Sequence, residues 1–280
     1  MENNLKKAIE KRNILLAAHR GVNGGNIPCN SMECYKIALN QGADVIEMDV
    51  TACKDKEELY MLHPGMEPVH TTAPAPLYTF TRKEVEKFVL KNQDLTPTQY
   101  PIITFGQALD ELKGKCFINV DKFWDNPKEI AQEIRKRNMQ DQVIVKSSPT
   151  NGKIMDAIEE YASDMQFLAI IGNPETACHE ELKRRKINYV GVEILINSDE
   201  HPFIQDEYIK AMHDEGKVVW TNTIVYDYKA NISGVHTDDV AVLGDPDLGW
   251  GYFAKKNVDI IQTDWLLPCD AYLKSKGYRR

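Results

Sequence analysis

Short apolar runs alternate along the chain with longer stretches in which apolar residues recur at helical spacing. The runs predict strands at 14–18, 45–50, 59–62, 116–120, 143–145, 167–171, 189–195, 218–220 and 260–262. The stretches between them predict helices at 31–40, 127–137, 151–162, 174–184, 203–214 and 248–255. Strands separated by helices favour parallel pairing with right-handed crossovers. With 59–62 counted as an adjunct of the second strand, eight strands remain, which predicts one TIM (β/α)8 barrel domain over 1–280.

Two stretches do not fit this alternation. Residues 63–101 are rich in proline and threonine, with one expected helix at 82–91, and we interpret them as a small insertion after the second strand. Residues 225–247 form a long polar loop after the seventh strand, and loops of that length in compact domains are usually functional. The last seven residues, KSKGYRR, are interpreted as a solvated tail.

Composition excludes several classes of protein. The hydrophobic fraction of 42% supports a large core, but no run of about 18 apolar residues predicts an integral membrane segment. A formal net charge of −8 argues against a nucleic-acid partner, because phosphate backbones bind to basic faces. The N-terminal segment carries charges where a signal peptide would be apolar, and the six cysteines form no regular framework. We therefore expect reduced thiols and a cytoplasmic protein, whereas the sequence says nothing about its oligomeric state.

Residues that carry chemistry lie at the ends of neighbouring predicted strands. His19 and Arg20 follow the first strand, Glu47 and Asp49 close the second, and His63 follows the run at 59–62. The carboxyl ends of parallel strands converge on one face, and that face holds the chemistry of such folds. Two histidines, one arginine and two carboxylates describe a phosphodiester-cleaving site better than they describe a core.

The carboxylates predict a metal site. Glu47 and Asp49 lie two apart on a strand, so both side chains point to the same side, and Asp121 ends the next strand around the barrel. Carboxylates held together repel one another unless a proton or a cation intervenes. Three oxygen ligands suit one divalent cation, Mg²⁺ or Ca²⁺, better than zinc. An isolated Glu-x-Asp would be an ordinary surface pair, but Asp121 and both histidines favour the metal.

The stretch AHRGVNGGNIPCNSMECYKIALNQGADVIEMDV, together with the histidine that ends the next strand, resembles the glycerophosphodiester phosphodiesterases. That family carries a His-Arg-Gly start, a Pro-Glu-Asn-Thr helix opening, a Gly-Ala-Asp turn, a Glu-x-Asp strand end and a second histidine. Here Cys29 replaces the glutamate of the helix opening, and Pro64 replaces the aspartate after the second histidine. A small residue beside the site is our interpretation of Cys29, with a nucleophile as the alternative.

The later strand ends extend this resemblance over nearly the whole chain. Asp121 stands where the family usually has glutamate, and Trp220-Thr221 and Gln262-Thr263-Asp264 are similar to the last two strand signatures. The resemblance implies a barrel enzyme with a divalent cation that cleaves small glycerophosphodiesters. A shorter carboxylate at position 121 is also similar to the sphingomyelinase D-type phospholipases, which share the barrel and the histidine pair.

The resemblance also implies a role for each residue. His19 and His63 jointly act as general acid and base, for which imidazole is suited near neutral pH. Arg20 binds the phosphate through its planar fork of donors. Lys122 adds a second positive group, or is an ordinary lysine at a strand end. Trp220 forms an apolar wall of the substrate site, or packs in the core.

Further residues at the predicted mouth are candidates for substrate contacts. Lys146 and Glu193 end later strands and are expected to line the mouth. The loop at 225–247 follows the seventh strand, and we expect it to read the alcohol or sugar head group through residues such as Asp238 and Asp239. A solvated acidic loop is the alternative interpretation.

We therefore expect a metal-dependent phosphodiester hydrolase with a small-molecule substrate. A lyase that releases a cyclic phosphate, in the manner of the sphingomyelinase D-type enzymes, is the first alternative. A non-catalytic phosphodiester or sugar-phosphate binding module is the second. Glycoside hydrolysis by Glu47 and Asp49 is disfavoured, because side chains two apart on one strand are poorly placed to flank a scissile bond.

Overall fold

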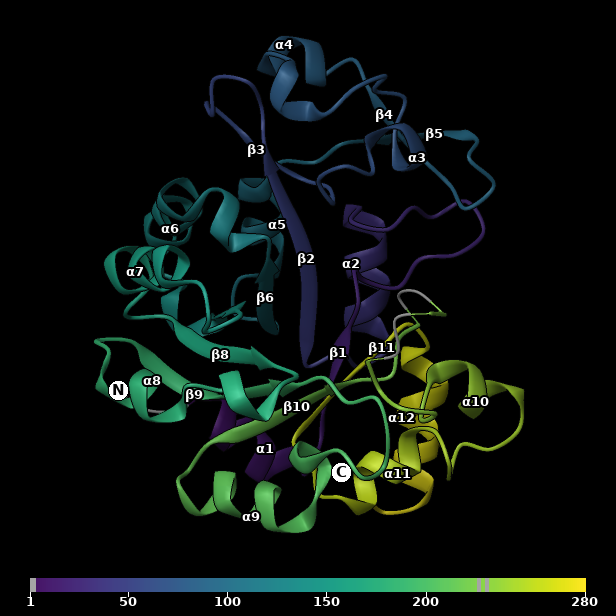
Figure 1. The fold of residues 1–280 in the computed structure, drawn as a ribbon. Helices are drawn as coiled ribbons and strands as arrows, with labels where there is room; N and C mark the ends of the chain where they lie inside the picture. The colour runs from purple at the N-terminus through teal and green to yellow at the C-terminus, as the bar shows by residue number, and fades with distance from the viewer. Residues whose placement is uncertain (1–3, 226–227, 230–231) are drawn as a thin grey trace.

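Eight parallel strands close into a barrel with helices around it (Figure 1). The computed structural model describes residues 4–225, 228–229 and 232–280. The strands follow one another in the order β1-β2-β6-β7-β8-β9-β10-β11, and β11 pairs with β1 to complete the ring. The predicted TIM barrel is therefore confirmed, with each predicted strand present within a few residues of its expected bounds.

The barrel strands are β1 (Leu15–Ala18), β2 (Val45–Ala52), β6 (Phe117–Asp121), β7 (Val143–Ser147), β8 (Gln166–Ile171), β9 (Asn188–Ile194), β10 (Val218–Asn222) and β11 (Ile260–Thr263). Three further strands belong to the insertion, namely β3 (Leu59–Met61), β4 (Val89–Lys91) and β5 (Pro97–Pro101). The barrel strands are buried on both faces, one facing the interior and one facing the helices, which explains their continuous apolar runs.

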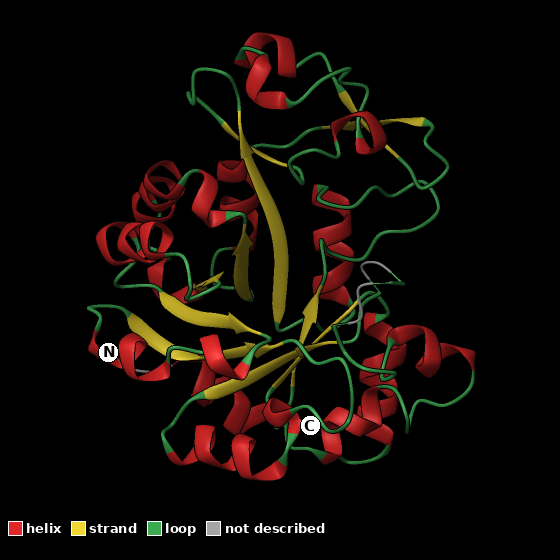
Figure 2. Ribbon diagram, viewed as in Figure 1, coloured by secondary structure: helices red, strands yellow, loops and turns green. Residues whose placement is uncertain are grey.

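The helices are α1 (Asn4–Arg12), α2 (Met32–Asn40), α3 (Glu67–His70), α4 (Arg82–Val85), α5 (Phe105–Leu112), α6 (Pro127–Lys136), α7 (Gly152–Tyr161), α8 (His179–Arg184), α9 (Asp206–Asp214), α10 (Asp238–Leu243), α11 (Trp250–Lys255) and α12 (Leu266–Ser275). Figure 2 shows how they surround the yellow strands. The sequence predictions missed α1, α3, α5, α10 and α12, although α5 carries a capping box of Thr104 and Gln107. No helix in the described part of the chain is long and apolar enough to cross a membrane.

The barrel interior has an apolar lower half. Side chains from seven barrel strands fill it, and Leu5 from α1 packs against them at the amino-terminal end of the strands. Trp220 is the largest of these side chains and is fully buried. Layers of side chains of this kind make a TIM barrel a packed core and not a pore. The chemistry is therefore confined to the upper half of the barrel.

The insertion after the second strand lies at the top of Figure 1 and has a small core of its own. β3 runs antiparallel to the end of β2, so the insertion begins as an extension of a barrel strand. The predicted helix at 82–91 is wrong beyond its first turn. Only Arg82–Val85 is helical, and Val89–Lys91 forms a strand with β5 because Leu90 is buried in the insertion core.

The carboxyl-terminal segment also differs from its prediction as a solvated tail. Arg279 is 3% exposed and lies at the base of the barrel, where its guanidinium pairs with Asp44 and with Asp270 at 2.7 Å. The same group donates to the carbonyl oxygens of Ile14 and Gly42. Positive charge at the end of the chain therefore closes the loops that precede β1 and β2.

Candidate active site

A cavity of about 290 Å³ opens at the carboxyl ends of the barrel strands. Six of the eight predicted site residues line it, from the ends of β1, β2 and β6 and the start of the insertion, whereas Asp49 and Trp220 do not. Its lining comprises His19, Arg20, Glu47, His63, Asn119, Asp121, Lys122, Trp124, Lys146, Ile170, Glu193, Leu195, Asn222, Ile224, Ile232 and Gln262.

The turn after β1 aims Arg20 at the carboxylates of β2. Arg20 and Gly21 both have left-handed backbone conformations, with φ of 56° and 82°. A side chain at position 21 would place its Cβ 2.5 Å from the Sγ of Cys34, so only glycine lets α2 pack against this turn. The Arg20 amide donates to Glu47 Oε2 at 2.8 Å, and its Nε lies 2.9 Å from Asp49 Oδ2.

Three carboxylates form a cluster that could hold a divalent cation. Glu47, Asp49 and Asp121 each offer an oxygen, and these oxygens lie within 4.8 Å of one another. β2 and β6 pair so that Asp49 stands opposite Asp121, which brings the third carboxylate to the other two. One oxygen of this group, Asp49 Oδ1, is buried without a hydrogen-bond partner. An orphaned anionic oxygen among hard donors fits Mg²⁺ or Ca²⁺, which prefer oxygen ligands.

The charge balance of the cluster favours a cation. Burial and the neighbouring charge of Asp49 raise the pKa of Glu47 to about 8. Burial also opposes ionisation of Asp121, but Lys122, followed by Lys146, holds the pKa of that carboxyl below its usual value. Three carboxylates thus share two cationic side chains, Arg20 and Lys122, and the raised pKa of Glu47 reflects the cost of ionising the third carboxylate without a further cation.

Asn30 is a site residue that the sequence predictions missed. It is fully buried, donates from Nδ2 to Asp49 Oδ2 at 3.0 Å, and accepts from the Tyr35 hydroxyl at 2.9 Å. Asn30 follows Cys29 in the helix opening before α2, where it fixes the orientation of Asp49. The Pro-x-Asn-Ser pattern before that helix was the available signal.

The two histidines lie in one cavity wall but have different partners. His19 Nδ1 lies 2.8 Å from Asp264 Oδ1, whereas His63 Nδ1 lies 2.9 Å from the carbonyl oxygen of Pro64. Because both partners are acceptors, each Nδ1 carries the proton and each Nε2 is left for other contacts. Burial lowers the pKa of His19, but its hydrogen bond to Asp264 and the charges of Glu47 and Asp264 outweigh it and raise the pKa above the usual value.

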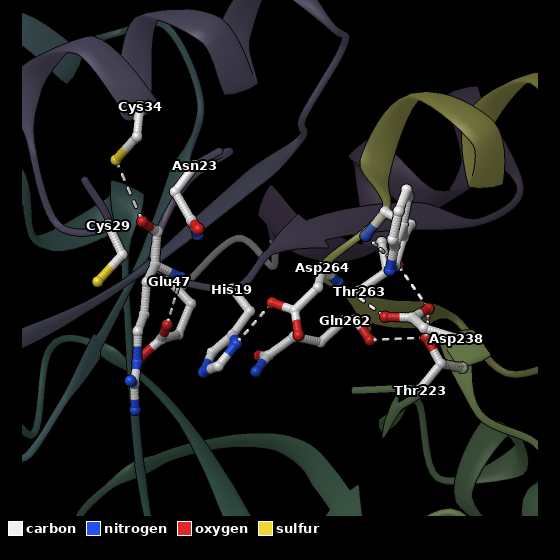
Figure 3. A network of polar contacts seen from close by, with 12 residues as sticks. His19, Asn23, Cys29, Cys34, Glu47, Thr223, Asp238, Gln262, Thr263 and Asp264 are labelled. Atoms are coloured by element: carbon white, nitrogen blue, oxygen red, sulfur yellow. Dashed lines mark hydrogen bonds and ion pairs between the residues drawn. The ribbon is translucent and has the colours of Figure 1, made fainter. Parts of the chain in front are cut away.

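Asp238 holds the turn that carries Asp264, the partner of His19 (Figure 3). It is buried, accepts from the hydroxyls of Thr223 and Thr263 and from Trp250, and accepts the backbone amide of Asp264 at 2.8 Å. Its carboxylate thus faces the barrel wall and not the mouth. The expectation that Asp238 reads a head group is wrong, because its oxygens hold the turn that carries Asp264. Residues 226–227 and 230–231 of the predicted loop lie outside the described residues.

Lys122 lies in the cavity as predicted, whereas Trp220 does not. Lys122 reaches the cavity from a left-handed backbone position, with Nζ 2.8 Å from Asp121 Oδ2 and 5.2 Å from the centre of the Trp124 ring. Trp220 does not line the cavity. Its ring lies beneath Lys146, whose Nζ is 3.9 Å from the ring centre, so the core interpretation of Trp220 holds and its expected contact with substrate is wrong. Trp124, which the predictions did not assign, supplies an aromatic wall.

Cys29 does not have the properties of a nucleophile. Its Sγ lies 3.8 Å from His70 Nδ1, and burial raises the pKa of the thiol to about 11. A thiol with such a pKa is almost entirely protonated at neutral pH. All six cysteines are free.

Comparison with known proteins relates this chain to other structures at the level of the fold. Residues 167–273 match the model of a family described only as a domain of unknown function. No curated protein sequence matches the chain. Solved structures with the same fold are, in contrast, numerous.

Glycerophosphodiester phosphodiesterases are prominent among these structures. The chain is similar to a glycerophosphoryl diester phosphodiesterase from Parabacteroides distasonis, with 22% identity, a TM-score of 0.75 and coverage of 94% of this chain and 87% of that one. It is similar to a glycerophosphodiester phosphodiesterase from Agrobacterium tumefaciens, with 19% identity, a TM-score of 0.67 and coverage of 92% and 99%.

A third similar structure is a phosphodiesterase from Oleispira antarctica in complex with the product sn-glycerol-3-phosphate, with 15% identity, a TM-score of 0.68 and coverage of 93% and 96%. At these identities the similarity establishes the fold, and the expected structural relationship to this class is confirmed at that level.

Proposed function

We propose that the chain is a metal-dependent phosphodiester hydrolase that converts glycerophosphodiesters to a phosphomonoester and an alcohol. The observation that carries this proposal is the convergence of two histidines, three carboxylates and Arg20 on one cavity of a glycerophosphodiester phosphodiesterase fold. The product bound to the Oleispira antarctica phosphodiesterase supports a compact phosphate ester as ligand. Six free thiols fit the expected cytoplasmic location.

Glu47, Asp49 and Asp121 are the proposed ligands of one Mg²⁺ or Ca²⁺. When bound, the cation offsets the negative charge of the cluster and polarises a non-bridging phosphoryl oxygen. Arg20 and Lys122 line the same cavity, although each also pairs with a carboxylate of the cluster. Their role is to hold the phosphate beside the carboxylates, so that charge developing on the phosphoryl oxygens meets fixed positive groups.

The partners of the histidines suggest separate tasks. Asp264 favours the protonated form of His19, which suits a general acid that gives a proton to the departing alcohol oxygen. The Pro64 carbonyl fixes the Nδ1–H tautomer of His63, which leaves Nε2 to accept a proton from the attacking group. If water attacks, the P–O bond to the alcohol breaks, the water oxygen stays on phosphorus, and one proton passes through each histidine.

Attack by a hydroxyl of the substrate itself is the second candidate reaction. It would use the same histidines but leave a cyclic phosphate, and the shorter carboxylate at Asp121 is the feature that favours it. Phosphorus NMR with a panel of glycerophosphodiesters, with Mg²⁺ or Ca²⁺ and again with chelator, separates the reactions. We expect a phosphomonoester only when metal is present. A persistent cyclic phosphate would establish the lyase, and no turnover across the panel would contradict both.

Replacing either histidine tests the roles of the side chains. We expect His19→Ala and His63→Ala each to lower kcat by about 10²–10⁴-fold, the usual contribution of general acid–base catalysis. Circular dichroism should show an intact barrel in both variants. His179→Gln is the matched control, because His179 contacts Tyr189 and Tyr208 outside the cavity. Normal turnover in either alanine variant would overturn the assignment.

A further inference from the structure

The cavity ends on a layer of polar side chains that the proposed reaction does not use. We call Asn119, Lys146, Glu193, Asn222 and Gln262 the polar floor; they come from β6, β7, β9, β10 and β11, and each is at most 6% exposed. Asn119 lies two residues before Asp121 on β6, and Gln262 lies on β11 two residues before Asp264, so both face the interior one step deeper. Beneath the floor lies the ring of Trp220.

The charges of the polar floor are satisfied within it. Lys146 Nζ lies 2.6 Å from Glu193 Oε2, and Asn222 Nδ2 donates to Glu193 Oε1 at 2.7 Å. The Lys146 ammonium also lies over the face of the Trp220 ring. This pair has no net charge and therefore does not attract a second phosphate or a cation. What it offers a ligand is the remaining donor capacity of the lysine, which has three N–H groups.

Two acceptors of the polar floor have no partner. Asn119 Oδ1 and Gln262 Oε1 are buried and accept no hydrogen bond within the described structure. Asn119 donates from Nδ2 to the Ile144 carbonyl oxygen, which leaves its own oxygen as the unpaired end. In Figure 3 the Gln262 side chain extends from β11 toward His19. Buried polar atoms are nearly always hydrogen-bonded, and leaving one unpaired is costly.

We infer that the polar floor binds hydroxyl groups of the substrate and selects compact polyol phosphates. A polyol donates hydrogen bonds to the two amide oxygens and accepts one from Lys146, so it satisfies all three groups at once. An aliphatic group leaves both oxygens unpaired, and a quaternary ammonium has no N–H to donate. This inference rests on the proposed function for the position of the phosphate, and it assigns recognition of the polyol that stays on the phosphate to the barrel interior.

The experiment compares two ligands that differ only in hydroxyls. Isothermal titration calorimetry measures the binding of sn-glycerol-3-phosphate and of n-propyl phosphate, once in Mg²⁺ and once in Ca²⁺. We expect the polyol to bind at least about tenfold more tightly, since two hydrogen bonds to otherwise unpaired buried oxygens are at stake. Equal affinities would overturn the inference and would mean that water fills the floor.

Variants locate the preference. Gln262→Met keeps the side-chain size but removes the acceptor, and should reduce the preference for the polyol by about tenfold without weakening n-propyl phosphate. The double variant Lys146→Met/Glu193→Gln removes the ion pair without leaving a buried charge, and it should also reduce the preference for the polyol. Thr221→Val is the matched control, because Thr221 Oγ1 is equally buried and unpartnered but does not line the cavity.

The results separate this inference from the proposed function. Turnover of phosphodiesters with no polyol preference would leave the hydrolase standing and overturn the role of the floor. A polyol preference that Gln262→Met abolishes, without turnover of any phosphodiester, would support the floor and overturn the hydrolase. An unchanged preference in both the Gln262→Met and the double variant would place recognition elsewhere and contradict the inference.

Discussion

The barrel has a buried cluster of charge at each end, and the two clusters differ in how completely they are paired. At the base, the Arg279 guanidinium contacts Asp44 and Asp270 and donates to two backbone carbonyls. At the mouth, Glu47, Asp49 and Asp121 share Arg20 and Lys122, and one oxygen of Asp49 has no partner. The charges of the base cluster are therefore paired by the protein's own groups, whereas those of the mouth cluster are not.

This difference teaches what each cluster contributes. A fully paired buried cluster holds distant segments together, here the chain end and the loops before β1 and β2. An incompletely paired one costs folding free energy that an added cation can recover, because a ligand that binds only the folded state stabilises it. The raised pKa of Glu47 is the sign of that cost. Stability and function are thus assigned to opposite ends of one barrel.

Breaking the base cluster should have the largest effect on stability. Arg279→Met leaves Asp44 and Asp270 without their shared cation, and we expect a loss of about 3–5 kcal/mol in the free energy of unfolding. Chemical denaturation measures it, and KM of the folded enzyme should not change. The neighbouring Arg280→Met is the control, since the Arg280 side chain is exposed. A loss of less than about 1 kcal/mol would mean that the base cluster is dispensable.

Neutralising one carboxylate at the mouth should increase the free energy of unfolding, whereas breaking the base cluster decreases it. In chelator, Glu47→Gln removes a buried charge beside Asp49 while its side-chain oxygen can still accept from the Arg20 amide. We expect a gain of roughly 2 kcal/mol at pH 8, the size typical when function is exchanged for stability. Thermal unfolding with and without Mg²⁺ or Ca²⁺ measures it, and the metal should stabilise the wild type more than the variant. Equal stabilisation of both would argue against Glu47 as a ligand.

A second ion pair at the base should make stability depend on pH, and we expect this effect on stability to be the smallest of the three. His213 Nε2 lies 2.9 Å from Asp259 Oδ2, and this hydrogen bond raises the pKa of His213 despite partial burial. The folded state therefore holds the proton more tightly, so its stabilisation is full below the unfolded pKa of about 6.5 and is lost as pH rises through the folded pKa.

His213→Gln should accordingly cost under about 1 kcal/mol at pH 5.5 and still less at pH 9, because the histidine is partly exposed. Urea denaturation of the variant and the wild type at both values measures the difference. A cost that grows with pH would reverse the assignment of His213 as the protonated partner.

The elements that could be predicted from the sequence depend on local patterns. Barrel strands are buried on both faces, so each appears as a continuous apolar run that needs no knowledge of its neighbours. The three carboxylates and His19 could be placed for a related reason, since parallel strands bring their ends to one face whatever the loops do. His19, Glu47 and Asp121 line one cavity as that argument requires, and His63 joins them from the end of the antiparallel strand β3.

Residues whose roles depend on distant partners could not be predicted. Arg279 has a polar, carboxyl-terminal context typical of a tail, but it is a buried cation that pairs with Asp44, 235 positions away, and with Asp270. Asp238 is similarly placed by Thr263 and Asp264 and not by its acidic neighbours. The stretch at 82–91 has helical spacing, but Leu90 gains more from the insertion core than from a continued helix.

The insertion makes the two histidines unequal in their dependence on the rest of the chain. His19 follows a barrel strand, whereas His63 follows β3, the strand that ties the insertion to the end of β2. The insertion core is separate from the barrel core, and Leu62, the residue before His63, packs in it. One of the two proposed proton-transfer groups is thus carried by the barrel itself, and the other by a segment added to it.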